Sequence, residues 1–286
     1  MAQTLGSVAV GSIVKLNESG SPVEYLVVQQ GKPGSMYDDS CDGTWLLRKN
    51  TDNTEVWDRD NSNVLESSDI QGWLNSTMLG KYDSDIQGAV KQVKIPYRKN
   101  GGSGGTDCTG GAGLQCKLFL LSCTEVGFTE NENSNLKNDG AKLDYFILGG
   151  ENSANQRRIT RTSGMVALPW WLRSPDVRGT AGVCRISETG SFESGNANGT
   201  YGARPAFVLP TTLFVLDDGT VSVAPPPPAT LTVPSIVMQG QGIPISWSQA
   251  DGADGYILER KADSGAWTQV YSGANLSYAD TAGSWS

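Results

Sequence analysis

The chain has 286 residues, a length that suits one large domain or two ordinary domains with a buried core. Its 35 glycines and its charged fraction of 18% are more typical of a strand-rich protein with many loops than of a helical bundle. The net charge of -8 argues against nucleic acid as a partner, because phosphate binding needs clustered Lys and Arg that no segment supplies.

Histidine is absent from the sequence. This absence removes the commonest general base, the nucleophiles that histidine activates, and zinc sites built on imidazole. We therefore expect a protein without enzymatic activity, metal or cofactor.

The first predicted elements are strands. Residues 12–16 and 23–28 are rich in alternating and β-branched apolar side chains, which predicts a hairpin that turns within residues 17–22. Residues 43–49 predict a third strand. The N-terminus carries no basic segment followed by an apolar run, and no stretch of 18 apolar residues follows, so we expect neither Sec export nor membrane insertion.

Short helices are predicted where a serine stands three residues before a glutamine or glutamate, which is the capping-box pattern. The pairs are Ser68 with Gln71, Ser84 with Gln87, and Ser122 with Glu125. The second helix would carry Ile86, Val90 and Val93 on one face and end before Pro96. The third would carry Val126 and Phe128.

Two polar segments interrupt the apolar pattern. Residues 99–113 are mainly Gly, Ser and Thr, which predicts a surface loop or flexible insertion, and residues 131–138 are again polar. Residues 116–121 predict a strand between them. The five cysteines are an odd number without CxxC spacing, so we expect reduced thiols, with a Cys108–Cys116 disulfide as the open alternative.

Two apolar motifs, PWWLRSP at 169–175 and GARPAFVL at 202–209, predict rigid strands. Successive strand residues face opposite ways, so one of Trp170 and Trp171 would pack inside and the other against a neighbouring layer. We expect Arg173 and Arg204 to hold buried loops by donating to backbone carbonyls. All four are predicted to be structural core residues.

The polar segment between these motifs is the predicted ligand-binding surface. Arg and aromatic anchors among Ser, Gly and Asn resemble the composition of a binding loop. The candidate residues are Arg178, Arg185, Glu188, Phe192, Glu193, Asn196, Asn198 and Tyr201. An ordinary solvated hairpin, with strands near 184–187 and 192 and a turn at 188–190, is an equally good interpretation.

Acidic residues suggest two further candidates. Residues 38–43 match the first half of an EF-hand loop, but Lys49 occupies the position of the bidentate glutamate, so a solvated turn is expected. A glycan-cleaving enzyme is a minor alternative, which would need two carboxylates about 5 to 10 Å apart. Its candidates would be Glu125, Glu151, Asp176 and Glu188.

A second module follows Pro225–Pro228, whose four prolines favour an extended polyproline II spacer. Residues 245–247, 255–260 and 267–271 resemble three strands of a fibronectin type III domain, with Trp247 and Tyr256 in its core, one from each sheet. Such a sandwich has about seven strands in 100 residues, so we expect this one to be incomplete. The predicted boundaries are a first domain at 1–222, a linker at 223–230 and a second domain at 231–286.

The first domain resembles an uncharacterised family of phage and prophage structural proteins with a WWLRSP core. Besides the two motifs at 169–175 and 202–209, the resemblance is carried by LGSVAVG at 5–11, SCDGTWLLR at 40–48, VKIPY at 93–97 and FLLS at 119–122. More distantly, those two motifs resemble the C-type-lectin-like fold. The fold class that this resemblance implies is α+β, with short helices on antiparallel sheets and long loops, followed by an all-β immunoglobulin-like sandwich.

The resemblance also implies a function. It is that of a virion structural and receptor-binding protein, in a tail fibre, tail tip or head fibre, with a bacterial cell-surface glycan or protein and other virion subunits as partners. A homo-oligomer is expected, assembled in the host cytoplasm, with no nucleic acid bound and no membrane insertion. The alternatives are an architectural virion subunit and an adhesin on the bacterial cell surface.

Overall fold

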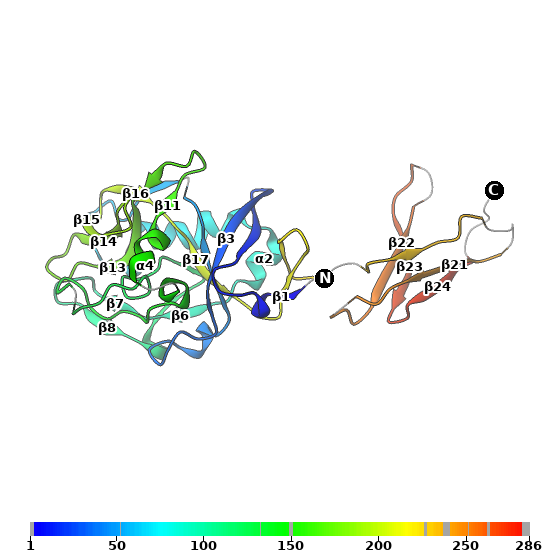
Figure 1. Ribbon diagram of the computed structural model, residues 1–286, viewed down its shortest axis with the longest axis horizontal. Coiled ribbons are helices and arrows are strands. Elements are labelled where there is room, and N and C mark those ends of the chain that lie inside the picture. The colour runs from blue at the N-terminus through cyan, green and yellow to red at the C-terminus, as the bar shows by residue number, and fades with distance from the viewer. Residues whose placement is uncertain are drawn as a thin grey trace. The chain divides into compact units, whose positions relative to one another are not determined.

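The computed structural model describes residues 3–51, 53–131, 133–148, 151–225, 228–236, 241–250, 252–261 and 264–281 (Figure 1). The chain divides into two compact units, one at Gln3–Val223 and one that begins at Ala224. The described residues are mostly β-sheet with a few short helices, as the α+β class requires.

The first sheet of unit one has the strand order β10-β17-β4-β3-β2. Its strands are β2 (Ile13–Glu18), β3 (Ser21–Gln30), β4 (Thr44–Arg48), β10 (Leu118–Phe119) and β17 (Ala206–Leu209). The predicted hairpin is present as β2 and β3, and its turn is only Ser19 and Gly20, with φ of 52° and 79°. Positive φ at both positions matches the twist of a two-residue hairpin turn.

The second sheet has the order β15-β14-β13-β16-β5 and lies at one side of unit one (Figure 1). Its strands are β5 (Thr54–Val56), β13 (Trp170–Pro175), β14 (Gly182–Ile186), β15 (Phe192–Asn196) and β16 (Thr200–Gly202). The hairpin of β14 and β15 pairs Arg185 with Glu193 and Ile186 with Phe192. The WWLRSP motif is therefore the central strand of the sheet that carries the predicted binding segment.

Smaller sheets complete unit one. One joins both ends of the unit in the order β1-β18-β19, and three are two-stranded pairs. Their strands are β1 (Gln3–Thr4), β6 (Val93–Ile95), β7 (Tyr97–Lys99), β8 (Thr106–Cys108), β9 (Leu114–Cys116), β11 (Thr160–Arg161), β12 (Ala167–Leu168), β18 (Phe214–Val215) and β19 (Val221–Ser222).

The helices are short. They are α1 (Asp69–Trp73), α2 (Ser84–Ala89), α3 (Asp144–Ile147) and α4 (Glu151–Arg158), with 3-10 turns η1 (Leu5–Ser7), η2 (Asp39–Cys41), η3 (Leu65–Ser67), η5 (Leu79–Lys81) and η6 (Gly110–Ala112) and a π-turn η4 (Leu74–Met78). Ser68 caps α1 by accepting a hydrogen bond from the Gln71 N–H at 3.3 Å, as the sequence predicts.

The predicted cap of α2 is wrong. Asp83, not Ser84, is the residue before the helix, and the Gln87 side chain donates to the Tyr82 carbonyl at 2.7 Å. The helix ends at Ala89, and Val93 already belongs to strand β6, which pairs with β9. The spacing of Val93 from Ile86 and Val90 also fits a helix, but pairing with β9 places Val93 in a strand.

The predicted helix after Ser122 is also wrong. The two capping bonds do form, with Ser122 Oγ accepting from the Glu125 N–H and Glu125 Oε2 accepting from the Ser122 N–H. They close a turn instead of a helix, because Gly127 at φ 93° reverses the chain and Glu125 is held by a distant arginine. The local capping pattern is therefore present, but the contact of Glu125 with Arg173 holds it in a turn.

The predicted loop at 99–113 is more ordered than expected. It contains the last residue of β7, its partner strand β8 and the turn η6, and β9 begins directly after it at Leu114. The Asn63 side chain accepts from the Gly102 N–H at 3.0 Å and donates to the Gly179 carbonyl at 3.1 Å. A Cβ on Gly102 would lie 2.1 Å from the Asp176 carbonyl oxygen, so a glycine at this position allows a close approach of two backbone segments.

Two apolar clusters fill unit one, and the neighbouring tryptophans belong to different clusters. Trp171 packs with Tyr25, Leu46 and Phe207, whereas Trp170 packs with Trp45 and Phe119. Both are 0% exposed. Strand alternation thus sends each tryptophan into a different core, and the motif is buried on both faces.

Unit two contains two small sheets within its described residues. They are formed by β20 (Leu231–Thr232), β21 (Ile243–Trp247) and β24 (Ser277–Asp280), and by β22 (Tyr256–Arg260) and β23 (Thr268–Gly273). Trp247 of one sheet lies 5.8 Å from Tyr256 of the other, between ring centroids. Of the predicted proline spacer, Pro226 and Pro227 lie outside the described residues.

Candidate functional site

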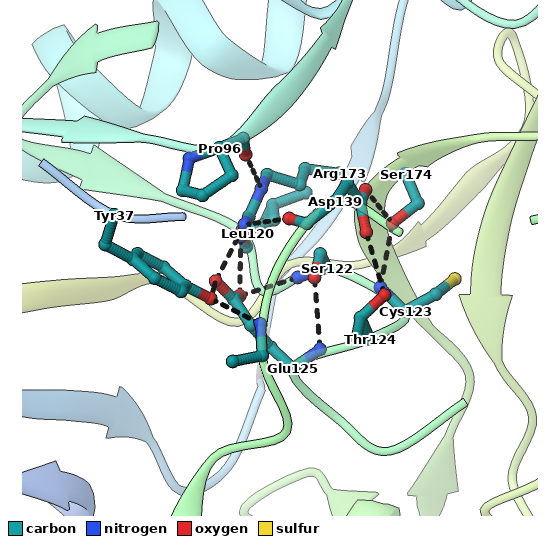
Figure 2. Close-up of polar contacts among 11 residues, drawn as sticks. Tyr37, Pro96, Leu120, Ser122, Cys123, Thr124, Glu125, Asp139, Arg173 and Ser174 are labelled. Atoms are coloured by element: carbon teal, nitrogen blue, oxygen red, sulfur yellow. Dashed lines mark hydrogen bonds and ion pairs between the residues drawn. The ribbon is translucent and has the colours of Figure 1, made fainter. Parts of the chain in front are cut away.

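Arg173 of β13 is the centre of a buried polar network (Figure 2). Its Nη1 and Nη2 donate to the Glu125 carboxylate at 2.6 and 2.7 Å. The remaining N–H groups donate to the carbonyls of Pro96, Leu120 and Asp139 at 3.1, 2.9 and 3.1 Å. All five donors of the guanidinium are therefore used, and three of the partners are the backbone carbonyls that the sequence predicts.

The carboxylates around Arg173 accept further hydrogen bonds from hydroxyl groups. Glu125 also accepts from the Tyr37 hydroxyl at 2.8 Å, and Asp139 accepts from the Ser174 hydroxyl at 2.6 Å. Burial alone would lower the pKa of Arg173, but the Glu125 carboxylate outweighs it and raises that pKa above its ordinary value. Burial raises the pKa of Asp139, although Arg173 and Ser174 oppose the shift.

This network connects four segments that are far apart in sequence. Tyr37 comes from the loop before β4, Glu125 from the turn after β10, and Asp139 from the loop before α3 (Figure 2). The side chains of Glu125 and Arg173 are 0% and 1% exposed. A bidentate buried ion pair of this kind fixes loop geometry, and it offers no group to a substrate.

The carboxylates considered for glycan cleavage lie in unlike surroundings. Glu125 is buried in this network, and Asp176 is ion-paired with Arg178 at 2.5 Å. Burial opposes ionisation of Asp176, yet the hydrogen bonds from Arg178 outweigh it, so its pKa lies below the ordinary value. Glu188 is exposed in the turn between β14 and β15, and the Glu151 side chain lies outside the described residues.

Three of the predicted ligand residues meet on one face of the second sheet. The Tyr201 ring packs edge-on against Trp171 with centroids 4.7 Å apart. The Arg185 guanidinium lies 3.9 Å from the Tyr201 ring centroid and forms an ion pair with Glu193 at 2.7 Å. Trp171 is thereby covered by a column of Tyr201, Arg185 and Glu193.

Glycines make room for that column. A Cβ on Gly195 would lie 3.3 Å from the Tyr201 ring, and one on Gly199 would lie 3.0 Å from it. The Arg185 Nε is buried and has no hydrogen-bond partner among the described residues. The column covers the core, and its outer member Glu193, with a side chain 42% exposed, faces solvent.

The other predicted ligand residues do not join this face. Phe192 points to the opposite face and packs edge-on against Phe128 at 5.7 Å. Arg178 pairs with Asp176 at the start of the segment, with its own side chain 65% exposed. Glu188, Asn196 and Asn198 are exposed at the two turns. The segment is therefore a hairpin with a packed middle and polar exposed ends.

Arg204, the fourth predicted core residue, is 1% exposed but lacks a carboxylate partner among the described residues. Its Nε and Nη2 donate to the carbonyls of Arg48 and Lys49 at 3.0 and 3.1 Å. The guanidinium lies 4.5 Å from the Trp170 ring centroid. Its pKa is lowered to about 10, mainly by burial and to a smaller extent by the nearby Arg48, while Tyr145 opposes the shift.

The acidic segment at 38–43 forms a turn, as its sequence indicates. Asp38 accepts from the Ser40 N–H at 3.0 Å and begins η2, while Asp39 pairs with Lys32 at 2.6 Å. Among the described residues, no group of three His, Cys, Asp or Glu side chains is arranged to hold a metal ion. The five cysteines are all unpaired, including Cys108 and Cys116.

A pocket of about 660 Å³ lies beside the Arg173 network, lined in part by Thr124, Gly140 and Ala141. It is lined by the loop around Ser35 and by the loops that carry Thr129, Asn131 and Asn138. The sequence predicts a polar segment at 131–138, and it gives no indication that this segment meets the loop around Ser35. The contact that brings these loops together is the hydrogen bond from the Tyr37 hydroxyl to the Glu125 carboxylate. It joins residues that are 88 positions apart in the sequence.

The fold and the site define a mostly-β protein whose loops are fixed by a buried ion pair. A family model described as a domain of unknown function, DUF6273, matches residues 42–211, and the chain belongs to this family. No curated protein and no solved structure matches the chain. No helix in the described part of the chain is long and apolar enough to cross a bilayer.

Proposed function

We propose that this protein is a phage virion structural and receptor-binding protein of a tail fibre, tail tip or head fibre. In this proposal unit one is a C-type-lectin-like domain that contacts a bacterial cell-surface glycan or protein, and unit two is a fibronectin type III module. The two five-stranded sheets with short helices and long loops support the first assignment. The facing Trp247 and Tyr256 of two small sheets support the second.

The observation that carries the proposal is the contrast within the hairpin of β14 and β15. Strand β14 of the hairpin pairs with the buried WWLRSP strand. At the ends of the hairpin, exposed polar side chains are presented by Arg178, Glu188, Asn196 and Asn198. Rigid strands that present polar loop residues are the usual construction of a binding surface, because little ordering entropy is lost on binding. The packed Phe192 and Tyr201 would support this surface and not touch the ligand.

The test is binding of the labelled full chain to whole bacterial cells. A variant with Glu188, Asn196 and Asn198 changed to Ala removes exposed side chains only and should fold like the parent. We expect saturable binding that this variant loses. The matched control changes the exposed Ser84 and Asp85 of α2, which lies at the other side of unit one, and should bind normally (Figure 1). Equal binding by both variants, or none by the parent, would contradict the receptor role.

The architectural alternative has one observation in its favour. Met165 and Val166, in the turn between β11 and β12, are 68% and 64% exposed, and Met165 has a φ of 64°. Exposed apolar side chains on a projecting turn suit a contact with another subunit. Sedimentation analysis of the parent and of Met165→Ser/Val166→Ser would test it: an oligomer that the double variant dissociates supports this role, and an unchanged species opposes it.

A further inference from the structure

A second pocket of about 380 Å³ lies next to Arg204, away from the proposed receptor-binding hairpin. Four of its lining residues are cations, namely Lys49, Arg157, Arg161 and Arg204. Its lining contains no Asp or Glu. On a chain with a net charge of -8, a pocket whose charged lining residues are all cations departs from the average surface.

The four cationic side chains use only some of their hydrogen-bond donors in contacts with other protein groups. Lys49 forms an ion pair with Glu24 at 2.7 Å. Arg161 donates to the Met165 carbonyl at 3.3 Å, and Arg157 donates to the Ser153 hydroxyl at 3.4 Å. Among the described residues, none of the three arginines is paired with a carboxylate. Their positive charge is therefore uncompensated by the protein.

Arg204 gives an independent indication of a ligand. Its Nη1 is buried and has no hydrogen-bond partner in the described part of the chain, whereas its Nε and Nη2 are both used. Leaving a buried charged donor unsatisfied is costly, so native structures normally supply a partner. The orientation of the Arg204 guanidinium is fixed by the Trp170 ring and by the two carbonyls that accept its hydrogen bonds. Its unused nitrogen is therefore already positioned for a ligand.

We propose that this pocket binds an oxyanion, the carboxylate or phosphate group of a small molecule, on the Nη1 of Arg204. Arg157, which is half-buried, and Arg161, which is exposed, would supply positive charge at the mouth of the pocket. The Tyr145 ring and Met165 also line it and offer an apolar surface to the remainder of the ligand. The volume is at the lower end of the range for small-molecule sites, which suits a ligand the size of an acidic monosaccharide.

This inference does not rest on the receptor proposal, because none of the pocket residues belongs to the hairpin of β14 and β15. Failure of cell binding would leave it intact. It assigns a ligand class to a part of the domain that the sequence motifs identified only as core.

Calorimetric titration of the full chain with glucose 6-phosphate, glucuronate and inorganic phosphate tests the proposal. Glucose and sodium chloride at equal ionic strength serve as controls for the sugar and for screening. We expect saturable binding of at least one oxyanion and none of glucose. Preference for the phosphorylated or the carboxylated sugar then identifies the group, and equal binding of inorganic phosphate shows that the anion alone suffices.

Variants connect the binding to the pocket. Arg204→Met should weaken it by about tenfold or more, since a charge-assisted donor is lost. Arg157→Ala/Arg161→Ala changes residues outside the core and keeps the test valid if Arg204→Met does not fold. Arg59→Ala, a change to an exposed arginine whose side chain is 73% exposed, is the matched control. No binding above the chloride control, or equal affinity in the parent and the pocket variants, would overturn the proposal.

Discussion

Two buried arginines from the paired motifs, Arg173 and Arg204, have the same exposure of 1% and opposite electrostatic surroundings. Arg173 uses all five N–H donors and faces a bidentate carboxylate. Arg204 donates to two carbonyls, stacks on Trp170 and keeps one nitrogen without a partner among the described residues. The pKa of Arg173 is raised and that of Arg204 is lowered.

Burial alone therefore does not decide the role of an arginine. A guanidinium whose donors are all satisfied holds loops together, and its removal leaves several groups without partners. A guanidinium with a spare donor beside a cationic pocket has capacity for a ligand. The same residue type, predicted to have the same structural role, therefore separates into two roles once its partners are known.

The largest expected effect is from Arg173→Met. The change leaves Glu125 as an unpaired buried charge, and breaking such a pair costs about 3 to 5 kcal/mol in the free energy of unfolding. Urea denaturation of the full chain, followed by near-UV circular dichroism, would measure it. The double variant Glu125→Gln/Arg173→Met should be less destabilised than Arg173→Met alone, and a cost that simply adds would contradict the ion-pair account.

The contact between Trp170 and Arg204 gives the next effect. Trp170→Phe and Arg204→Met should be coupled by about 0.5 to 1 kcal/mol in a double-mutant cycle, because the indole face touches only one of the two arginines. Trp171→Phe is the matched control, since Trp171 is equally buried but packs on Tyr201. Equal coupling of Arg204 to both tryptophans would show that stacking is not the cause.

Arg204→Met by itself should change the free energy of unfolding by only about 1 kcal/mol or less in the absence of ligand. Two hydrogen bonds to carbonyls are lost, but an incompletely satisfied buried charge is removed with them. The same denaturation experiment compares it directly with Arg173→Met. A loss as large as that of Arg173→Met would contradict the distinction between the two arginines.

The smallest effect is a pH dependence in the Arg173 network. Burial raises the pKa of Asp139 above its ordinary 3.8, so its contribution to stability is fully present below that pH and is lost as pH rises through the raised value. Asp139→Asn removes this loss and should gain stability relative to the parent as pH increases from acid toward neutral.

Asp218 provides a control of opposite sign. Hydrogen bonds from Thr220 lower its pKa, so its contribution is present above the ordinary 3.8 and is lost as pH falls through the lowered value. Asp218→Asn should therefore lose stability relative to the parent as pH rises. Unfolding curves at several pH values would test both variants, and parallel profiles for the two would contradict the assignment.

Local patterns predicted much of unit one. The hairpin of β2 and β3, the cap of α1 at Ser68 and the burial of both tryptophans all follow from alternation or capping. The helix predicted from Ser84 is present as α2, but its extension to Val93 and the helix after Ser122 are wrong, because β9 pairs with Val93 and Arg173 holds Glu125. Such partners lie tens of residues away, and a single sequence carries no signal that joins them.

The candidate sites follow the same division. The sequence predicted that Arg173 and Arg204 donate to carbonyls, and both do. It did not predict the Glu125 and Asp139 partners, the column of Tyr201 and Arg185, or the cationic pocket around Arg204. Of the eight proposed ligand residues, the folded hairpin packs Phe192 and Tyr201 and exposes Glu188, Asn196 and Asn198.

Residue types and their alternation are enough to predict the strand-rich character of the chain, the burial of the WWLRSP strand on both faces and the absence of histidine chemistry. These properties depend on residue type and on a period of two, which are local. Only the tertiary structure decided which buried arginine meets a carboxylate. An electrostatic partner is chosen by distance in space, and here Arg173 reaches Glu125 across 48 residues while Arg204 reaches none among the described residues.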